Sequence, residues 1–352
     1  MRAVWGSDLS QLKNWTHDGK AFVIAEVGQN HQGSLEKARE YIRILAFEGA
    51  SAVKFQTRNN RYLFSADAYD APYHSENAFA DTYGAHRECL ELKPEWLEIL
   101  RDDCIKHDVK FMSTPFDEPS LELLDRLDVD LLKIASFDLG NLPFIDRVGR
   151  LGKPTVLSIG GGRAEAIQAS VAALRQHHDD LAVLHCVSEY PCEYHRLGLD
   201  NVEALKAAFP DLTIGLSDHF NGILSGPVAY LKGARVFEKH VTLNRGWRGT
   251  DHSFALEPEG FRKFVRDIRR VGQMLTPKTD DLGEEPVFKK LGKSLVAIND
   301  LPAGQTLQLE HLTGRIFRET HIPVRESHQV LGRRLLQPIK AGEPIMWNAL
   351  EP

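Results

Sequence analysis

The feature of this sequence that most constrains its fold is a repeated alternation of short apolar runs with longer segments of helical periodicity. The segments between the runs are amphipathic, and EGFRKFVRDIRRVGQML closes the series. Eight such units predict a TIM barrel, the (β/α)8 fold of about 250 residues. The eight predicted strands lie at 22–28, 52–57, 109–114, 131–136, 154–160, 181–187, 212–218 and 234–242.

A doubly wound parallel sheet is the competing architecture for such an alternating pattern. That fold usually has fewer strands, and it carries a glycine fingerprint after the first strand, which is missing here. The barrel prediction also places the long insert at 58–92. Because this insert follows the second strand, we expect it on the catalytic face of the barrel.

The pattern changes after about residue 276. We therefore predict a barrel domain at 1–276, a polar and turn-rich linker at 277–290 and a small β-rich domain at 291–352. The last part holds an internal repeat, because PAGQTLQLEHL (302–312) resembles KAGEPIMWNAL (340–350) position by position. Each copy predicts a turn at Ala-Gly, then an apolar pair and a short helix that ends in Leu.

Composition excludes several classes of partner and compartment. The 352 residues carry a formal charge of −6 without a basic stripe, which disfavours nucleic acid and anionic membrane surfaces as partners. No apolar run approaches the roughly 18–20 residues that span a bilayer, and the first residues lack the apolar core of a signal peptide. The four cysteines show no CxxC spacing and predict reduced thiols in a cytoplasmic protein.

Polar side chains occupy the carboxyl end of nearly every predicted strand. Barrel interiors are normally filled by Val, Ile and Leu, and the active site lies at the carboxyl ends of the strands. Packing does not explain such a ring, so we interpret it as a functional site. In chain order the ends present Glu26, Asn30 and His31; Lys54 and Gln56; Ser113 and Thr114; Lys133, Ser136 and Asp138; Ser158; His185, Ser188 and Tyr190; Ser217, Asp218 and His219; and Glu238, Lys239 and His240.

Two lysines indicate an anion pocket. Lys54 and Lys133 stand within apolar runs, and a lysine in such a run usually points into a site because burying an unpaired ammonium is costly. Together with the nearby hydroxyl side chains and the glycine turn at 160–162, they predict a pocket for phosphate or carboxylate. The alternative is that both are surface lysines placed in the wrong register.

Two histidines indicate a metal site. His219 and His240 follow neighbouring strands, each next to an acid, and neutral imidazoles with carboxylates nearby suit Mn²⁺ or Zn²⁺. Either histidine by itself would more often be a hydrogen-bonded core residue. His31 and His185 are reserve ligands in this interpretation. An open site of this kind polarises a carbonyl as a Lewis acid.

These features together predict a cationic pocket for a small phosphorylated or carboxylated substrate, with a metal on the opposite wall. In GTDHSFALEP, we expect Asp251 to contact substrate and His252 to be a loop residue. Two reactions satisfy this description: the attack of phosphoenolpyruvate on a metal-bound aldehyde, and a metal-dependent aldol reaction. Composition does not separate them.

The chain resembles the sialic acid (N-acetylneuraminate) synthase family over nearly its whole length. The resemblance is carried by FVIAEVGQNHQGSLEKA, ASAVKFQT, FMSTPFD, LLKIASFDLGNLP, LHCVSEYP, IGLSDHFNG, FEKHVTLNR and GTDHSFALEP, in this order. The C-terminal repeat, with KSLVAINDLPAG and LGRRL, resembles the antifreeze-like (SAF, β-clip) domain of that family. The family condenses phosphoenolpyruvate with an N-acylated hexosamine to give a nine-carbon 2-keto acid and phosphate.

The resemblance implies a role for each matching residue. Phosphoenolpyruvate would be bound by Lys54, Thr114, Lys133, Ser136, Ser217 and Ser188, the last in place of the usual Asn. The catalytic residues would be Glu26, Lys133 and Asp138, the last in place of a usual Glu. The divalent metal, Mn²⁺ by resemblance, would be held by His219 and His240 and would polarise the aldehyde. The sugar would face Glu26, Gln56, Tyr190 and Asp251.

One departure from the family pattern concerns the acceptor. The family usually carries an RPG segment in the antifreeze-like domain, whose arginine reaches the sugar in the partner subunit of a homodimer. The aligned position here is near Ile316, and Arg315 and Arg318 are the candidate substitutes. If one of them substitutes, the acceptor can be N-acetylmannosamine. If neither does, the acceptor could instead be a diacetamido hexose, a plain hexose or a pentose phosphate.

Two further functional classes remain open. The chain could be a non-catalytic relative whose antifreeze-like domain binds a glycan or a partner, or an aldolase that uses pyruvate. The intact charged residues at the strand ends argue against the first, since an idle barrel has no reason to keep buried charges together. A requirement for phosphoenolpyruvate in place of pyruvate would exclude the second.

Overall fold

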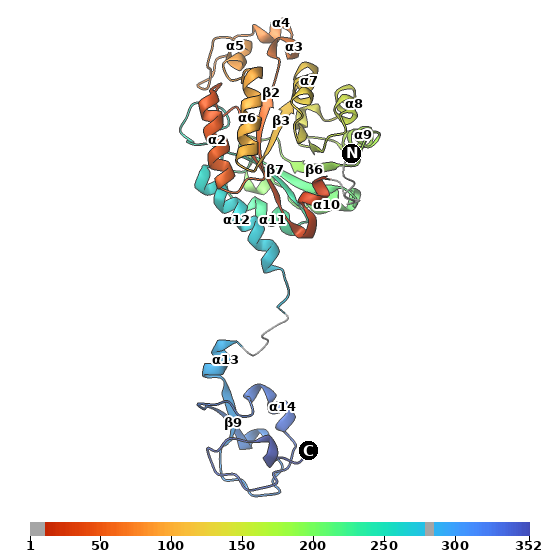
Figure 1. The fold of residues 1–352 in the computed structure, drawn as a ribbon. Helices are drawn as coiled ribbons and strands as arrows, with labels where there is room; N and C mark the ends of the chain where they lie inside the picture. Colours follow the sequence, from red (N-terminus) through yellow and green to blue (C-terminus); the bar gives the residue numbers. More distant parts are fainter. Residues whose placement is uncertain (1–10, 279–284) are drawn as a thin grey trace, which may run out of the picture. The chain divides into compact units, whose positions relative to one another are not determined.

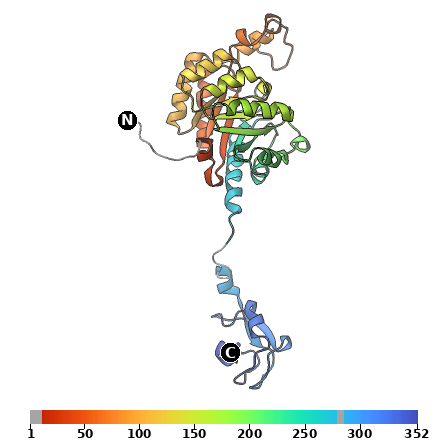
Figure 2. The ribbon, with the colours of Figure 1, turned by 90° about the vertical axis from the view of Figure 1, so that its right-hand side faces the viewer.

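A computed structural model describes residues 11–278 and 285–352 of the chain. It divides into two compact units, Met1–Leu275 and Thr276–Pro352. Figures 1 and 2 show the first unit in red to cyan and the second in blue. None of the described helices combines the length and the apolar character needed to span a lipid bilayer.

The first unit is a closed barrel of eight parallel strands, in which each strand pairs with the next and the eighth pairs with the first. This confirms the predicted TIM barrel and rules out the doubly wound sheet. All eight predicted strands are present, most of them shorter than predicted at one or both ends. They are β1 (Phe22–Gly28), β2 (Ala52–Thr57), β3 (Lys110–Pro115), β4 (Leu131–Ile134), β5 (Thr155–Ser158), β6 (Leu181–Cys186), β7 (Thr213–Asp218) and β8 (Val236–His240).

One main helix follows each strand. Ser34 caps the first of them, because its side chain accepts a hydrogen bond from the backbone N–H of Lys37. These helices are α2 (Leu35–Phe47), α6 (Pro94–Lys106), α7 (Glu118–Arg126), α8 (Leu142–Arg150), α9 (Ala164–Arg175), α10 (Asn201–Ala208), α11 (Ser225–Leu231) and α12 (Pro258–Met274). The insert after β2 adds α3 (Asn60–Leu63), α4 (Ala66–Tyr69) and α5 (Tyr83–Glu88), which group together at one end of the barrel in Figure 1.

The interior of the barrel is apolar at one end and polar at the other. A short helix before β1, α1 (Gln11–Trp15), buries Leu12 against the apolar end, and Trp15 stacks on Phe22 with ring centroids 5.0 Å apart. Along each strand the side chains that point inward are two residues apart. The apolar residues of this inner cluster precede polar ones at the next inward position: Ile24 before Glu26, Ala52 before Lys54, Met112 before Thr114, Leu131 before Lys133, Val156 before Ser158 and Val236 before Glu238.

The second unit is built on a two-stranded antiparallel sheet with several single bridges around an apolar core. Both copies of the predicted repeat form the predicted turn, with positive φ at Gly304 and Gly342, followed by a short 3₁₀ helix. Of the predicted linker, residues 279–284 lie outside the described residues, and 286–290 are helical. The elements are α13 (Pro286–Leu291), β9 (Lys293–Ala297), β10 (Leu312–Ile316) and α14 (Ser327–Val330).

Candidate active site

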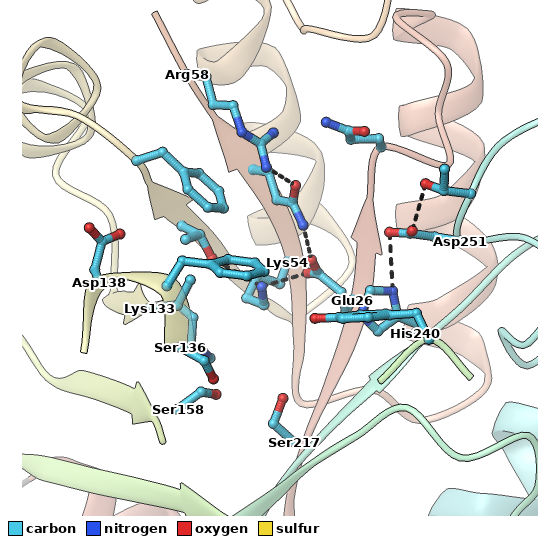
Figure 3. A pocket seen from close by; sticks show the side chains of 18 of the residues that line it. Glu26, Lys54, Arg58, Lys133, Ser136, Asp138, Ser158, Ser217, His240 and Asp251 are labelled. Atoms are coloured by element: carbon cyan, nitrogen blue, oxygen red, sulfur yellow. Dashed lines mark hydrogen bonds and ion pairs between the residues drawn. The ribbon is translucent and has the colours of Figure 1, made fainter. Parts of the chain in front are cut away.

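A cavity of about 910 Å³ opens at the carboxyl ends of the barrel strands. The insert contributes to its wall through α3 and α5, as the position after β2 predicted. Figure 3 shows the labelled side chains gathered around this cavity. Of the barrel residues with a predicted binding or catalytic role, twelve line it: Glu26, Lys54, Gln56, Thr114, Lys133, Ser136, Asp138, Tyr190, Ser217, His219, His240 and Asp251.

Two lysines and two glutamates form a buried cluster in the cavity. The Nζ of Lys54 lies 2.7 Å from Oε2 of Glu26 and 3.5 Å from Oε1 of Glu238, and the Nζ of Lys133 lies 4.0 Å from Oε2 of Glu238. Register explains part of the arrangement, because Glu26 is opposite Lys54 on the neighbouring strand. The lysines are therefore not surface residues in the wrong register.

The protonation states of this cluster follow from burial and charge. Burial raises the pKa of Glu26 to about 7, although the Lys54 ammonium opposes the shift. Burial alone would also raise the pKa of Glu238, but Lys133 and Lys54 hold it below its ordinary value. Burial lowers the pKa of Lys133. Glu26 is therefore the carboxyl of the cluster that changes protonation near neutral pH.

Glu238 lies at a predicted strand end, but no role was predicted for it. Its partners come from β2 and β4, and only barrel closure brings these strands and β8 around one cavity. Its spacing could have indicated a place in the site, because Glu238 and His240 stand two residues apart on β8 and so point to the same face.

The two predicted metal ligands lie side by side, with His219 and His240 ring centroids 5.2 Å apart. The Nδ1 of His219 is 2.7 Å from the carbonyl oxygen of Val187. Since a carbonyl only accepts, this nitrogen carries a hydrogen, which leaves Nε2 as the nitrogen available to bind a metal in the neutral tautomer. Burial lowers the pKa of His240, so that imidazole is neutral, and its Nδ1 is buried without a hydrogen-bond partner.

This donor set fits a divalent cation with an open coordination sphere. The two imidazoles supply nitrogen ligands of the kind that Mn²⁺ and Zn²⁺ accept. Among residues 11–278 and 285–352, no group of three or more His, Cys, Asp or Glu side chains meets as a metal cluster. The remaining coordination positions would therefore fall to water and substrate.

Hydroxyl groups line the cavity beside the lysines. Ser136 accepts a hydrogen bond of 2.9 Å from the backbone N–H of Gly160, and the Oγ of Ser158 is buried without a partner. A Cβ at Gly160 would lie 2.2 Å from the Oγ of Ser188 and 2.9 Å from that of Ser136, so any larger residue there would force these hydroxyl groups to move. Ser188 itself lines a neighbouring groove between α9 and α10 and not the main cavity.

The predicted sugar-facing residues Gln56, Tyr190 and Asp251 contact Glu26 and the two histidines. The Nε2 of Gln56 donates to Oε1 of Glu26 at 2.8 Å. The ring of Tyr190 lies against that of His219, with centroids 4.0 Å apart, and Oδ2 of Asp251 lies 3.6 Å from Nδ1 of His240. Asp138 lines the cavity on the Lys133 side, and burial raises the pKa of its carboxyl.

Several polar residues at the strand ends do not belong to the cavity. Lys239 and Asp218 form a fully buried ion pair at 2.6 Å behind the barrel wall. The three other histidines of this region are hydrogen-bonded elsewhere. They are His31, whose Nδ1 accepts from the N–H of Gly33, His185, which donates to the carbonyl of Leu197, and His252, which contacts Thr242. None of them lines the cavity, so His31 and His185, the predicted reserve ligands, do not lie beside His219 and His240.

Two arginines of the cavity wall, Arg58 and Arg87, were not predicted as site residues. Arg58 directly follows β2, and Arg87 lies on α5 of the insert. Both belong to the segment that was predicted to cover the catalytic face, but the sequence carries no periodicity that would single them out. Only the folded insert shows which of its charges point inward.

The site and fold agree with those of known proteins. The model of the NeuB family matches residues 41–280, and that of the SAF domain matches residues 292–351. The N-acetylneuraminate-9-phosphate synthase of Mus musculus is 32% identical over 332 residues, which cover 94% of this chain and 92% of the relative. The chain belongs to the NeuB family.

Other members of the NeuB family show the same relationship. The N,N'-diacetyllegionaminic acid synthase of Legionella pneumophila is 32% identical and is aligned over 94% of both chains. The crystal structure of N-acetylneuraminic acid (sialic acid) synthetase from Leptospira borgpetersenii, in complex with citrate, superposes with a TM-score of 0.66 at 29% identity. That alignment covers 77% of this chain and 92% of the other. The chain is thus an enzyme of a synthase family with a C-terminal SAF domain.

The SAF domain carries the two arginines that were predicted to substitute for the missing one. Arg315 belongs to β10, where it pairs in register with Ser294, and Arg318 follows that strand. Both side chains are exposed on the SAF domain, as is that of Ile316. Their part in sugar binding stays a prediction.

Proposed function

We propose that this NeuB-family enzyme condenses phosphoenolpyruvate with the aldehyde of an acyl-amino hexose, giving a nine-carbon 2-keto acid and phosphate. The observation that supports this most strongly is the buried cluster of Lys54, Lys133, Glu26 and Glu238 beside His219 and His240. Relatives named as synthases of N-acetylneuraminate 9-phosphate and of diacetyllegionaminic acid agree with a nonulosonic acid product.

Phosphoenolpyruvate would bind on the lysine side of the cavity. Its carboxylate and phosphate need cations and hydroxyl donors, and Lys54 and Lys133 supply the positive charge. The hydroxyl groups of Thr114, Ser136, Ser158 and Ser217 line the same space. Glu238 lies between the two ammonium groups, so it holds both in place without a substrate.

A divalent metal, Mn²⁺ in this proposal, would be held by His219 and His240. When bound, it would supply a Lewis acid that polarises the carbonyl of the acceptor. The protein prepares these ligands through the Val187 carbonyl, which fixes the tautomer of His219, and through burial, which keeps His240 neutral.

The reaction consumes one water, forms a C–C bond and, at carbon 2 of phosphoenolpyruvate, replaces the C–O bond to phosphate by a C–O bond to the oxygen of water. Carbon 3 of phosphoenolpyruvate joins the aldehyde carbon, whose oxygen gains a proton, and water then adds to carbon 2 before phosphate leaves. Glu26 can give and take a proton near neutral pH because burial raises its pKa to about 7. Glu26 or Asp138 orients the incoming water from the cavity wall.

The test is phosphate release from phosphoenolpyruvate with Mn²⁺ and a panel of acceptors: N-acetylmannosamine, mannose, two diacetamido hexoses and arabinose 5-phosphate. Release with an acyl-amino hexose, together with a nine-carbon keto acid in the mass spectrum, supports the proposal. Turnover of pyruvate in place of phosphoenolpyruvate would instead show an aldolase. Binding of phosphoenolpyruvate without turnover of any acceptor would favour the non-catalytic alternative.

We also infer that the enzyme acts as a homodimer in which the SAF domain of one copy reaches the cavity of the other. Arg315 and Arg318 are exposed on that domain and would contact the acceptor. A single-chain mass in light scattering would contradict the dimer. Equal acceptor KM values for wild type and the Arg315→Ala, Arg318→Ala double variant would contradict the role of the arginines.

A further inference from the structure

The outer wall of the cavity carries two arginines that the proposed chemistry does not use. Arg58 leaves the end of β2, and Arg87 comes from α5 of the insert. In Figure 3, Arg58 lies across the cavity from Ser136, Ser158 and Ser217. Hydrogen bonds run from Arg58 to Gln56 and from Gln56 to Glu26, which in turn pairs with Lys54. The side chains of Gln56 and Glu26 thus lie between Arg58 and Lys54.

The positive charge of this arginine pair is only partly compensated. The Nη1 of Arg58 is 3.3 Å from Oε1 of Glu91, and both side chains are largely buried. Burial, and then the charge of Arg87, lowers the pKa of Arg58 to about 10. Among the residues that the structure describes, no carboxylate lies within ion-pair distance of Arg87. One carboxylate therefore faces two guanidinium groups.

The same corner has more hydrogen-bond donors than acceptors. The Nη1 of Arg87 donates to Oε1 of Gln29 at 2.9 Å. Its Nε is buried without a partner, and so is the Nε2 of Gln29. Buried donors of this kind usually have a partner, and leaving one unpaired is costly. Both side chains line the cavity, so a bound ligand with acceptor oxygens can approach this donor-rich corner.

A phosphate group matches both deficits. It carries about −1.5 to −2 charges at pH 7 and presents three acceptor oxygens. Guanidinium groups bind phosphate through paired N–H donors. A single carboxylate would offer one charge and two oxygens, and an amide carbonyl would offer no charge. The phosphate of phosphoenolpyruvate has its own cations in Lys54 and Lys133.

We propose that Arg58 and Arg87 form a second anion subsite, which binds a phosphate at the end of the acceptor sugar remote from its aldehyde. This inference rests on the proposed condensation and narrows its acceptor to a phosphorylated acyl-amino hexose. The insert then selects the acceptor, while the strand ends bind phosphoenolpyruvate.

The experiment compares three acceptors that differ only at carbon 6: N-acetylmannosamine, its 6-phosphate and its 6-carboxylate. The keto acid product is measured by mass spectrometry, because one acceptor itself contains phosphate. We expect kcat/KM of the wild type to be about 10- to 100-fold higher for the 6-phosphate than for the other two, as expected for hydrogen bonds to a charged group. Equal or better use of the uncharged sugar would contradict the anion subsite. Preference for the 6-carboxylate would contradict the assignment of phosphate as its ligand.

Variants separate binding from folding. Arg87→Gln should raise the KM for the 6-phosphate about 10- to 100-fold and leave kcat/KM for the uncharged sugar and the KM for phosphoenolpyruvate within about 3-fold. Arg87→Lys should restore part of the loss. The matched control is Arg61→Gln, because Arg61 is exposed on α3 and stacks on Tyr69 without lining the cavity. An equal loss with both sugars would show a structural role and overturn the proposal.

A binding measurement keeps the inference separate from the reaction. Calorimetric titration with N-acetylmannosamine 6-phosphate, without phosphoenolpyruvate, should give binding to the wild type and about 10-fold or weaker binding to Arg87→Gln. If no acceptor yields a keto acid but this difference is found, the proposed reaction fails and the subsite stands. If the 6-phosphate binds no better than the uncharged sugar, the subsite fails whatever the reaction.

Discussion

The carboxyl end of the barrel and the core of the C-terminal unit both exclude water, but they bury different side chains. The barrel end buries ionisable groups from several strands, among them Glu26, Lys54, Lys133 and Glu238. In the described part of the C-terminal unit, Ser294 is the only buried polar side chain. The core there consists of Leu295, Ala297, Leu301, Leu307, Ile322, Val330, Leu335, Ile339, Ile345, Ala349 and Leu350.

This difference separates the demands of chemistry from those of packing. A small unit gains stability by removing apolar surface from water, and a buried charge would only reduce that gain. A site for anionic substrates needs charges that are already desolvated and fixed before the substrate arrives. The barrel can accommodate them because its apolar layers, centred on residues such as Ile24 and Val236, lie beneath them.

The largest expected effect concerns the buried ion pair behind the barrel wall. Lys239→Met leaves the Asp218 carboxylate without its partner, so we expect a loss of about 3–5 kcal/mol in the free energy of unfolding. The double variant with Asp218→Leu should recover most of this loss. Urea unfolding followed by circular dichroism measures both.

The matched control for this pair lies in the C-terminal unit. Lys340 and Asp300 are 2.8 Å apart, with side chains 75% and 62% exposed. Lys340→Met should change stability by about 1 kcal/mol or less. Similar losses at both pairs would contradict the contrast between the two units.

The second prediction tests the charges inside the cavity. Lys133→Met should lower kcat/KM for phosphoenolpyruvate about 10²–10³-fold, because one preorganised cation is lost. Lys110→Met is the control. Lys110 lies at the amino end of the neighbouring strand β3, away from the cavity, and pairs with Asp130. Initial rates of phosphate release measure kcat/KM for both variants. Equal losses in the two variants would show that the lower rate reflects lost protein stability and not the lost cation.

The third prediction concerns the loss of stability at acidic pH. Burial lowers the pKa of His31 to about 3, so the fold favours the neutral imidazole. Its contribution to stability is complete above the unfolded pKa of 6.5 and is lost as pH falls towards 3. Between pH 7 and pH 5 the wild type should lose about 2 kcal/mol more than His31→Asn. Unfolding curves at the two pH values measure this difference, and parallel curves would contradict it.

The smallest effect is expected in the apolar core. Ile345 is fully buried there, and Ile345→Val removes one methylene group, so the C-terminal unit should lose about 1 kcal/mol. Because this core holds no ionisable side chain among its described residues, the loss should be the same at pH 7 and pH 5. A loss that grows with acid would show an unrecognised coupling to a titrating group.

Local patterns in the sequence determined the fold class and much of the site. Strand and helix periods are local properties, so they identified the eight barrel strands, the repeat in the C-terminal unit and the carboxyl ends of the strands. Twelve residues with a predicted role line one cavity, and the alternation of side chains along parallel strands explains those that lie on strands, such as Lys54 and Lys133. The family resemblance added roles to residues such as His219 and His240.

Only the tertiary structure decided which polar residues act together. Asp218 and Lys239 follow the same sequence pattern as Glu238 and His240, yet they point to the other face and form a structural ion pair. Glu238 meets Lys54 and Lys133 because the barrel closes, and the arginines of the insert face the cavity because of long-range packing. The two-residue alternation along a strand assigns each side chain to one face of the sheet. The partners that the side chain meets there depend on strands and loops that are distant in sequence.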